Sequence, residues 1–448
     1  GSNETAVSID RFLFGVEMTH HVILGAGPAG VIAAETIRKL APQDTITLVG
    51  DEPEPPYSRM AIPYLLMGNV DESGTYLRKS PTHFEDLKIN VVRALVESVQ
   101  AATKIVALKG GATLSYDTLL VATGSHPVSP PIPGIQSEGV HTCWTLADAR
   151  AIAERAKPGA RVLQLGAGFI GCIIMESLAS RGVKLSVVEM GDRMVPRMMG
   201  PTAGGMIRDW CEAKGVEVFT GTKVESIEPG TPLTVKLSNG TSMLADLVIS
   251  AAGVRPAIGF LEHSGITCLL GVLTDEHLQT NVPGVFAAGD CAEAFDKVSG
   301  KTMVSAIQPN AAEQARIAAA NMVSYARGQP AQADLSGVTQ INVLDTLGLI
   351  SASFGDWAGT PTCDHVELTD KASGRHLSLR FQDDVMVGCN AVGWTEHIGV
   401  MRGLVEGQIK LGVWKDKLMQ DPTRLVQAYQ ASALGQDDWS GGKTGRKR

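Results

Sequence analysis

The chain has 448 residues, of which 44% are hydrophobic and 19% charged, with a formal net charge of −8. This length exceeds one typical domain of ~100–200 residues, and the negative charge argues against a nucleic-acid-binding protein. The longest apolar runs fall short of the ~20 residues that span a membrane. Seven cysteines with no C-x-x-C or C-x4-C pair indicate a reducing, cytoplasmic compartment and no cysteine-based metal site.

The first recognisable element is a strand, a tight turn and a helix. A mostly apolar run is followed by three glycines at the spacing G-x-G-x-x-G and then by a helix-forming run; the glycines are Gly25, Gly27 and Gly30. The first glycine allows the turn, the second lets a pyrophosphate approach the backbone, and the third lets the helix pack on the strand. A second β-rich run, 45–49, precedes Asp51 and Glu52, where an acid would hold a ribose.

The same pattern returns 141 residues later (166 minus 25), with the glycines Gly166, Gly168 and Gly171. Residues 185–188 form its second β-rich run, and Glu189 is the acid that follows. One such motif is weak evidence, because glycine-rich turns are common. Two copies predict two dinucleotide-binding units.

The rest of the chain suggests how these units are arranged. A proline-rich linker closes the first unit, and a strand that ends in Gly289-Asp290 returns the chain to it before a helix over 310–320. Runs typical of strands and then of helices fill the C-terminal part. The predicted fold is therefore α/β, with a first dinucleotide-binding unit at 18–127 and 256–335, a second at 138–252, a C-terminal α+β domain at 336–430, and flexible termini at 1–17 and 432–448.

Four landmarks stand in a set order: the first glycine motif, Ala122-Thr123-Gly124, the second glycine motif, and the strand ending in Gly289-Asp290. This order resembles the two-dinucleotide-binding flavoproteins that include glutathione reductase. The runs Pro56-Tyr57-Ser58-Arg59 and 309–315 are similar to the rubredoxin, putidaredoxin and nitrite reductase branch. The resemblance covers roughly residues 20–430.

The resemblance implies FAD on the first motif and NAD(H) on the second. It assigns to FAD the glycine turn, the ribose acid (Asp51, or else Glu52), an adenine-side contact, and groups near the flavin: Gly25, Gly27, Ala29, Gly30, Asp51, Glu52, Arg59, Val96, Thr123, Gly124, Asp290 and Gln308. It assigns to the nicotinamide coenzyme Gly166, Gly168, Phe169, Ile170, Gly171, Glu189 and Gly253. Because Glu189 would repel a 2′-phosphate, NADH is favoured over NADPH, although Arg193 and Arg197 lie close in sequence.

Several positions depart from the relatives. Met60 stands where disulfide reductases and NADH oxidases carry a redox cysteine. Tyr64 and Ile173 stand where ferredoxin reductases pair a lysine with a glutamate beside the flavin, so these two residues are expected to be neighbours there. Phe169 matches an aromatic that covers the flavin, or else packs in the core. Glu396 and His397 form an acid–histidine pair at a spacing unlike that of the disulfide reductases, so a surface or core pair is the default.

The function that the resemblance implies is an NADH-dependent FAD oxidoreductase without a protein nucleophile. A hydride passes from NADH to FAD, and electrons then pass to a small redox protein, expected to be an iron–sulfur protein. Direct reduction of oxygen, a peroxide or a quinone is an alternative, as is an electron-transfer subunit of a larger complex or a redox-sensing scaffold with little turnover. A homodimer through residues 336–430 is also expected.

Overall fold

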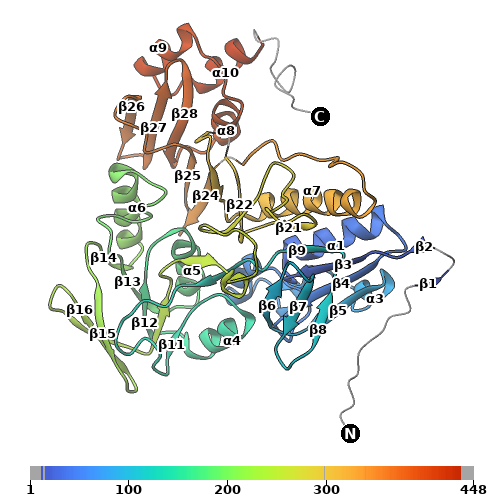
Figure 1. Ribbon diagram of the computed structural model, residues 1–448. Coiled ribbons are helices and arrows are strands. Elements are labelled where there is room, and N and C mark those ends of the chain that lie inside the picture. Colours follow the sequence, from blue (N-terminus) through green and yellow to red (C-terminus); the bar gives the residue numbers. More distant parts are fainter. Residues whose placement is uncertain (1–11, 14–15, 297, 339, 435–448) are drawn as a thin grey trace.

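The computed structural model describes residues 12–13, 16–296, 298–338 and 340–434. Figure 1 shows three bodies, each built on a five-stranded sheet: one from the N-terminal part, one from the middle, and one from the C-terminal part. No helix within the described ranges is long and apolar enough to cross a membrane. At the start of the chain a short hairpin pairs β1 (Phe12–Leu13) with β2 (Val16–Glu17), inside the range expected to be flexible.

The first sheet is wholly parallel. Its strands in spatial order are β21 (Val285–Ala287), β9 (Thr118–Val121), β3 (His20–Leu24), β4 (Thr45–Gly50) and β5 (Ile89–Arg93). The helices α1 (Pro28–Leu40) and α7 (Gln308–Ala326) lie side by side against one face (Figure 1). The antiparallel sheet of β6 (Val96–Gln100), β7 (Ile105–Leu108) and β8 (Thr113–Ser115) covers the other. Burial on both faces explains why these strands are apolar runs without alternation.

The second sheet is also wholly parallel and follows the same plan. Its strands in order are β11 (Val140–His141), β18 (Leu247–Ser250), β12 (Arg161–Leu165), β13 (Lys184–Val188) and β14 (Glu217–Phe219). It carries the helices α4 (Leu146–Arg155), α5 (Phe169–Ala179) and α6 (Pro201–Ala213) and the antiparallel sheet β15 (Val224–Glu228), β16 (Leu233–Leu237) and β17 (Ser242–Ala245).

Two antiparallel strands join the first unit to the second. The chain leaves the first unit through β10 (Ser125–Pro127) and returns through β19 (Val254–Pro256), and these strands pair with each other. The return then runs through the small sheet of β20 (Val272–Leu273), β22 (Ala292–Phe295) and β23 (Thr302–Val304), while β21 pairs with β9 inside the first sheet. Both crossings therefore lie side by side at the place where the two units meet.

The C-terminal body is an antiparallel sheet with helices on one face. Its strands in order are β24 (Ile341–Thr346), β25 (Leu349–Gly355), β28 (Val385–Val392), β27 (Arg375–Gln382) and β26 (Asp364–Asp370). The helices α8 (Ile398–Glu406), α9 (Val413–Gln420) and α10 (Leu425–Leu434) share its apolar core. The last helix runs past the expected domain end at 430. The opposite face carries buried polar side chains and lies toward the second unit, where β24 packs on α5 and β28 on α6 (Figure 1).

Residues 52–77, which we call segment 52–77, follow the first unit's strand β4 but pack on the second unit. The segment contains the one-turn helix Arg59–Ala61 and α2 (Ile62–Leu66), and α3 (His83–Asp86) follows it. Its buried side chains Tyr57, Ile62 and Leu66 belong to the apolar core that includes α4 and α5. This placement brings the segment to the seam between the units.

Candidate functional site

The first glycine turn has the geometry that a bound pyrophosphate needs. Gly25 has φ +113°, and a Cβ there would lie 2.0 Å from the Ala122 carbonyl oxygen. A Cβ on Gly30 would lie 1.8 Å from the Gly25 oxygen, so this glycine allows α1 to pack on the strand. Among the described residues, none other than Gly27 and its neighbours along the chain has an atom within 4 Å of a Cβ built on Gly27. The middle glycine therefore leaves open space beside the N-terminus of α1, where an anion is stabilised.

The second turn repeats this geometry. Gly166 has φ +99°, and its Cβ would lie 2.2 Å from the Ala251 oxygen, while one on Gly171 would lie 2.7 Å from the Gly166 oxygen. Again the middle glycine, Gly168, has no neighbour within 4 Å of a built Cβ. The two turns thus leave the same open approach to the backbone.

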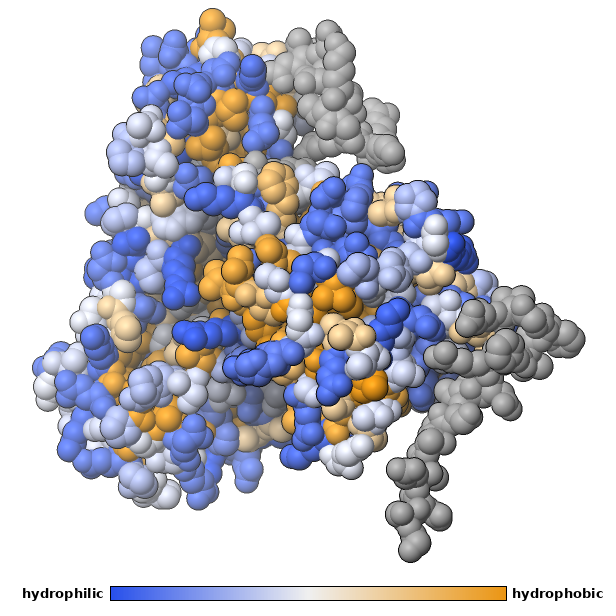
Figure 2. Space-filling view, viewed as in Figure 1, coloured by the Kyte–Doolittle hydropathy of each residue, from blue (hydrophilic) through white to orange (hydrophobic). Residues whose placement is uncertain are grey.

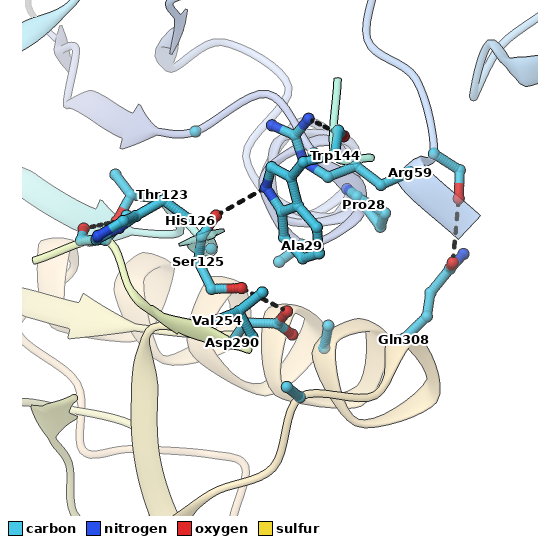
Figure 3. Close-up of a pocket in the computed structure, with 18 of the residues that line it drawn as sticks. Pro28, Ala29, Arg59, Thr123, Ser125, His126, Trp144, Val254, Asp290 and Gln308 are labelled. Atoms are coloured by element: carbon cyan, nitrogen blue, oxygen red, sulfur yellow. Dashed lines mark hydrogen bonds between the residues drawn. The ribbon is translucent and has the colours of Figure 1, made fainter. Parts of the chain in front are cut away.

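A cavity of about 720 Å³ lies at the seam of the two units. Its size falls in the range of ligand-binding clefts. All but one of the residues assigned to FAD line it: Gly25, Gly27, Ala29, Asp51, Glu52, Arg59, Val96, Thr123, Gly124, Asp290 and Gln308. From the second unit it is lined by Phe169, Ile170 and Ile173 at the start of α5. Figure 3 shows Arg59, Trp144, Asp290 and Gln308 around this space. On the outer face, Figure 2 shows hydrophobic residues gathered at the centre, where Figure 1 draws β21, β22 and α5.

The remaining assigned residues do not line the cavity. Gly30 supports the turn from below, as its contact with Gly25 shows. The coenzyme residues Gly166, Gly168, Gly171, Glu189 and Gly253 lie outside it, so the cavity reaches only the start of α5 in the second motif. Tyr64 is also outside and 53% exposed. Because Ile62 and Leu66 face the core at the helical spacing i and i+4, Tyr64 between them is turned away. Its expected place beside the flavin with Ile173 is therefore corrected.

The two acids predicted to hold a ribose, Asp51 and Glu189, occupy different register positions. The Val49 carbonyl accepts from Gly25 N at 2.7 Å, and the Val188 carbonyl accepts from Gly166 N at 2.8 Å. Glu189 is therefore equivalent to Gly50, and Asp51 comes one residue later. A Cβ on Gly50 would lie 2.8 Å from the Ala26 Cβ, so a side chain at that position would require the first turn to shift.

Glu189 holds the second turn directly. Ala167 N donates to its Oε2 at 2.7 Å and Gly191 N to its Oε1 at 2.9 Å. A carboxylate in this place keeps further acceptor capacity for a ribose diol. Arg193 is engaged elsewhere, because its Nε donates to the Met199 carbonyl at 2.8 Å. Glu189 is therefore the charged side chain that bonds directly to the turn.

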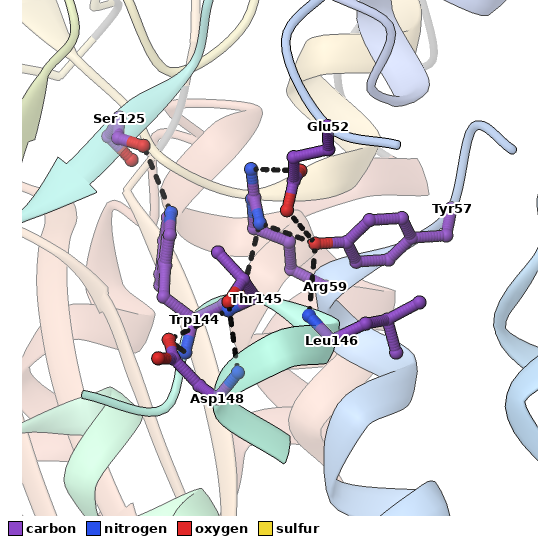
Figure 4. Close-up of polar contacts among 8 residues, drawn as sticks. All are labelled: Glu52, Tyr57, Arg59, Ser125, Trp144, Thr145, Leu146 and Asp148. Carbon is purple, nitrogen blue, oxygen red and sulfur yellow. Dashed lines mark hydrogen bonds and ion pairs between the residues drawn. The ribbon is translucent and has the colours of Figure 1, made fainter. Parts of the chain in front are cut away.

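Arg59 is the centre of a polar network that sequence patterns do not show (Figure 4). Its Nη1 donates to the Trp144 carbonyl and to Tyr57 Oη, both at 2.8 Å, and its Nη2 pairs with Glu52 at 3.0 Å. Tyr57 Oη donates to Glu52 Oε1 at 2.6 Å, and burial raises the pKa of Tyr57. The Arg59 guanidinium also lies 5.4 Å from the Trp144 ring centre. Arg59 thereby ties segment 52–77 to the second unit, and Glu52 is already bonded within the protein.

Polar groups of the first unit converge on the far side of the cavity. Ser125 Oγ donates to Asp290 Oδ2 at 3.3 Å, and Trp144 Nε1 donates to the Ser125 carbonyl at 3.1 Å. Burial raises the pKa of Asp290, against the opposing effects of Ser125 and Arg59. Gln308, at the N-terminus of α7, accepts from Ser58 at 3.2 Å. Ser125 and Trp144 were missed because neither lies in a recognisable motif.

The side of the cavity formed by α5 and Met60 is apolar, and the described residues place no activated thiol there. Phe169, Ile170, Ile173 and Ile174 line it from α5, and Met60 from segment 52–77. All seven cysteines are free. Burial raises the pKa of Cys143, the one cysteine in the cavity lining, to about 12. In the C-terminal body Glu396 pairs with Arg375 at 3.1 Å. Among the described residues no group of three or more His, Cys, Asp or Glu side chains could hold a metal ion.

The residues present fit a dinucleotide at each turn. Each middle glycine leaves the backbone open where a Cβ would otherwise stand, and each is followed by the N-terminus of a helix of at least eleven residues. The cavity extends from the first turn to the start of α5. A flavin seated on the first unit would therefore be within reach of a nicotinamide seated on the second.

Residues 19–319 match the family described as Pyridine nucleotide-disulphide oxidoreductase. The chain is 29% identical over 411 residues to the NADH-dependent phenylglyoxylate dehydrogenase subunit epsilon of Aromatoleum evansii, covering 91% of this chain and 96% of the relative. It is 31% identical to the biphenyl dioxygenase system ferredoxin–NAD(+) reductase component of Paraburkholderia xenovorans, covering 67% and 74%. Its fold matches a chain of the crystal structure of the covalent putidaredoxin reductase–putidaredoxin complex, with a TM-score of 0.82 at 23% identity, covering 92% and 99%. The expected α/β fold and family resemblance are confirmed.

Proposed function

Because the chain belongs to the pyridine nucleotide-disulphide oxidoreductase family, and is an oxidoreductase that uses FAD and NAD(H), we propose that it takes electrons from NADH and delivers them to a small iron–sulfur protein. The observation that carries the proposal is the shared cavity. Residues of the first glycine turn and of the helix after the second turn line one space. FAD bound there supplies the chemistry, by accepting two electrons from NADH and releasing them singly.

The chain's own residues have three tasks in this proposal. The two glycine turns and Glu189 hold the nucleotides, and Asp51 or Glu52 contacts the FAD ribose. Phe169 and the isoleucines of α5 exclude water from the nicotinamide side. Asp290, which accepts a hydrogen bond from Ser125, contacts the ribityl–phosphate part of FAD in this proposal. None of these groups acts as a nucleophile, which agrees with a relative named as a ferredoxin reductase and with the raised pKa of Cys143.

A second candidate has its own support. The phenylglyoxylate dehydrogenase subunit matches nearly end to end, C-terminal domain included. In this reading the chain is the FAD/NAD subunit of a larger dehydrogenase, and the partner subunits select the substrate. A homodimer through residues 336–430 would be incompatible with a complex that uses the same surface.

Electron transfer, measured in parallel with and without dissolved oxygen, tests the proposal. The purified, FAD-loaded protein is mixed with NADH and then with an oxidised ferredoxin or rubredoxin, and absorbance follows both partners. Reduction of the iron–sulfur protein faster than reduction of dissolved oxygen supports the proposal. Reduction of oxygen alone contradicts it and favours an oxidase. Stable co-purification with other dehydrogenase subunits from the source cell favours the second candidate.

A further inference from the structure

The C-terminal sheet sends one buried polar side chain into the second unit. Asn390 lies on β28, the central strand of that sheet, and is only 2% exposed. Its Oδ1 accepts from Gly200 N at 2.8 Å, and its Nδ2 donates to the Met198 carbonyl at 3.0 Å. Because backbone N–H and C=O groups have fixed roles, this arrangement sets the orientation of the amide. One side chain thus satisfies two backbone groups of another body.

Those two backbone groups belong to the loop 190–200, which follows Glu189 and ends where α6 begins. The loop is fixed to the glycine turn at Ala167. Val195 N donates to the Ala167 carbonyl at 2.8 Å, while Ala167 N donates to Glu189. Met194 and Met199 of the loop are fully buried. Loop 190–200 and its hydrogen bonds therefore connect the contact at Gly200 with the second glycine turn.

We propose that Asn390 is a positioning residue for NADH, which holds the second glycine turn through loop 190–200. The inference rests on the proposed placement of NADH on that turn. Asn390 does not touch the coenzyme. It sets the position of Met198 and Gly200, these set Val195, and Val195 with Glu189 sets Ala167 from both sides. Removing the amide leaves the buried Met198 carbonyl and the half-buried Gly200 N–H without this partner, which favours a looser loop.

The chain offers a matched control. Ser378 lies beside Asn390 on the neighbouring strand, in register with it and on the same buried face. Its hydroxyl bonds to His365 of its own sheet at 2.8 Å and has no bond to the second unit. Ser378→Ala therefore perturbs the same sheet without touching loop 190–200.

The experiment compares Asn390→Ala, the milder Asn390→Ser, Ser378→Ala and Glu189→Ala in FAD-loaded protein. Coenzyme affinity is measured by titration with NAD+, and loop order by amide hydrogen exchange of residues 191–200 without coenzyme. We expect Asn390→Ala to weaken binding about tenfold, in line with two lost hydrogen bonds, and to speed exchange in the loop. Asn390→Ser should show a smaller change of the same sign. In the two Asn390 variants, FAD content and kcat at saturating NADH should stay within about twofold of the unaltered protein.

The outcomes distinguish a failure of the inference about Asn390 from a failure of the proposed coenzyme site. If Asn390→Ala speeds exchange of residues 191–200 but leaves the affinity for NAD+ unchanged, Asn390 is a purely structural residue and the inference is overturned. Unchanged exchange of these residues overturns it as well. If Ser378→Ala has the same effects, the cause is the sheet as a whole and the inference also fails. If Glu189→Ala leaves affinity unchanged as well, then the coenzyme does not bind on this turn and the proposed site is wrong. If Asn390→Ala does not fold, Asn390→Ser carries the test.

Discussion

Gly27→Ala is the substitution that best separates cofactor binding from folding. Gly27 has φ −81° and ψ −169°, a conformation open to alanine, and no protein atom lies within 4 Å of the added Cβ. The protein without FAD should therefore be unchanged or stabilised by ~0.4–1 kcal/mol, because alanine restricts the unfolded chain. The Cβ would instead stand where the pyrophosphate approaches.

The cost to FAD binding follows from the contact that is lost. One hydrogen bond to a charged group contributes ~1.5–3 kcal/mol, so FAD affinity should fall about 10- to 150-fold. Gly168→Ala is the matched control, since it has φ −77°, ψ −169° and the same open surroundings in the second turn. It should weaken NADH binding and leave FAD binding intact. Gly30→Ala, whose Cβ would lie 1.8 Å from the Gly25 oxygen, should instead prevent normal folding.

The assay combines FAD titration of the apoprotein, followed by flavin fluorescence, with urea unfolding of the same apoprotein. The reasoning is refuted if Gly27→Ala binds FAD as tightly as the unaltered protein. It is equally refuted if the apoprotein loses more than ~1 kcal/mol of stability, since the added methyl group should meet nothing in the fold.

Four further outcomes are expected. Glu189→Ala should narrow the preference for NADH over NADPH by about 10- to 100-fold in steady-state kcat/KM, and equal kcat/KM for the two coenzymes in the unaltered enzyme would contradict this role. Replacing each of the seven cysteines singly by serine should leave stopped-flow reduction of FAD by NADH within a few-fold, because no thiol beside the cavity is activated; loss of reduction with FAD retained would point to a redox cysteine. The stability changes of Tyr64→Lys and Ile173→Glu should add within ~0.5 kcal/mol in thermal unfolding, since Tyr64 faces solvent, whereas a larger coupling would place the two side chains in contact. Burial would raise the pKa of Glu35, but Arg78 and His83 lower it, so the pKa in the folded protein lies below its ordinary value. Ionised Glu35 therefore stabilises the fold above its unfolded pKa, and this stabilisation is lost as the pH falls through the folded pKa. In urea titrations, Glu35→Gln should lose less stability between pH 5 and pH 3 than the unaltered protein.

Features set by a few consecutive residues could be predicted from the sequence. The glycine turns follow from local geometry, since Gly25 and Gly166 both have positive φ and both lie against a neighbouring carbonyl. The acid after the second strand is likewise local; its bond to the Ala167 N–H was not predicted, and its contact with a ribose stays a prediction. The C-terminal elements were only partly anticipated. Their order, strands and then helices, could be predicted, but the end of the last helix at Leu434 lies beyond the expected domain end at 430.

Features that depend on the meeting of distant segments could not be predicted. Trp144 reaches the cavity because the crossing strands β10 and β19 bring the two units together, and no motif marks it. The expected position of Tyr64 beside the flavin was wrong, because a match with relatives shows which residue corresponds but not which face of a helix carries its side chain. The one-residue offset between Asp51 and Glu189 appears only when the hydrogen bonds of both turns are compared.

Segment 52–77 shows why chain order alone misleads about the units. It follows the first unit's strand β4, yet α2 is buried in the second unit's core, and the Arg181 guanidinium donates to the Leu66 carbonyl at 2.9 Å. Arg150 of α4 pairs with both Glu54 and Glu72. Exposed ion pairs such as these contribute little individually, but the buried apolar contacts beside them make separation of the units costly. The fold therefore holds the two turns in a fixed relation, as transfer between two bound nucleotides at one cavity requires.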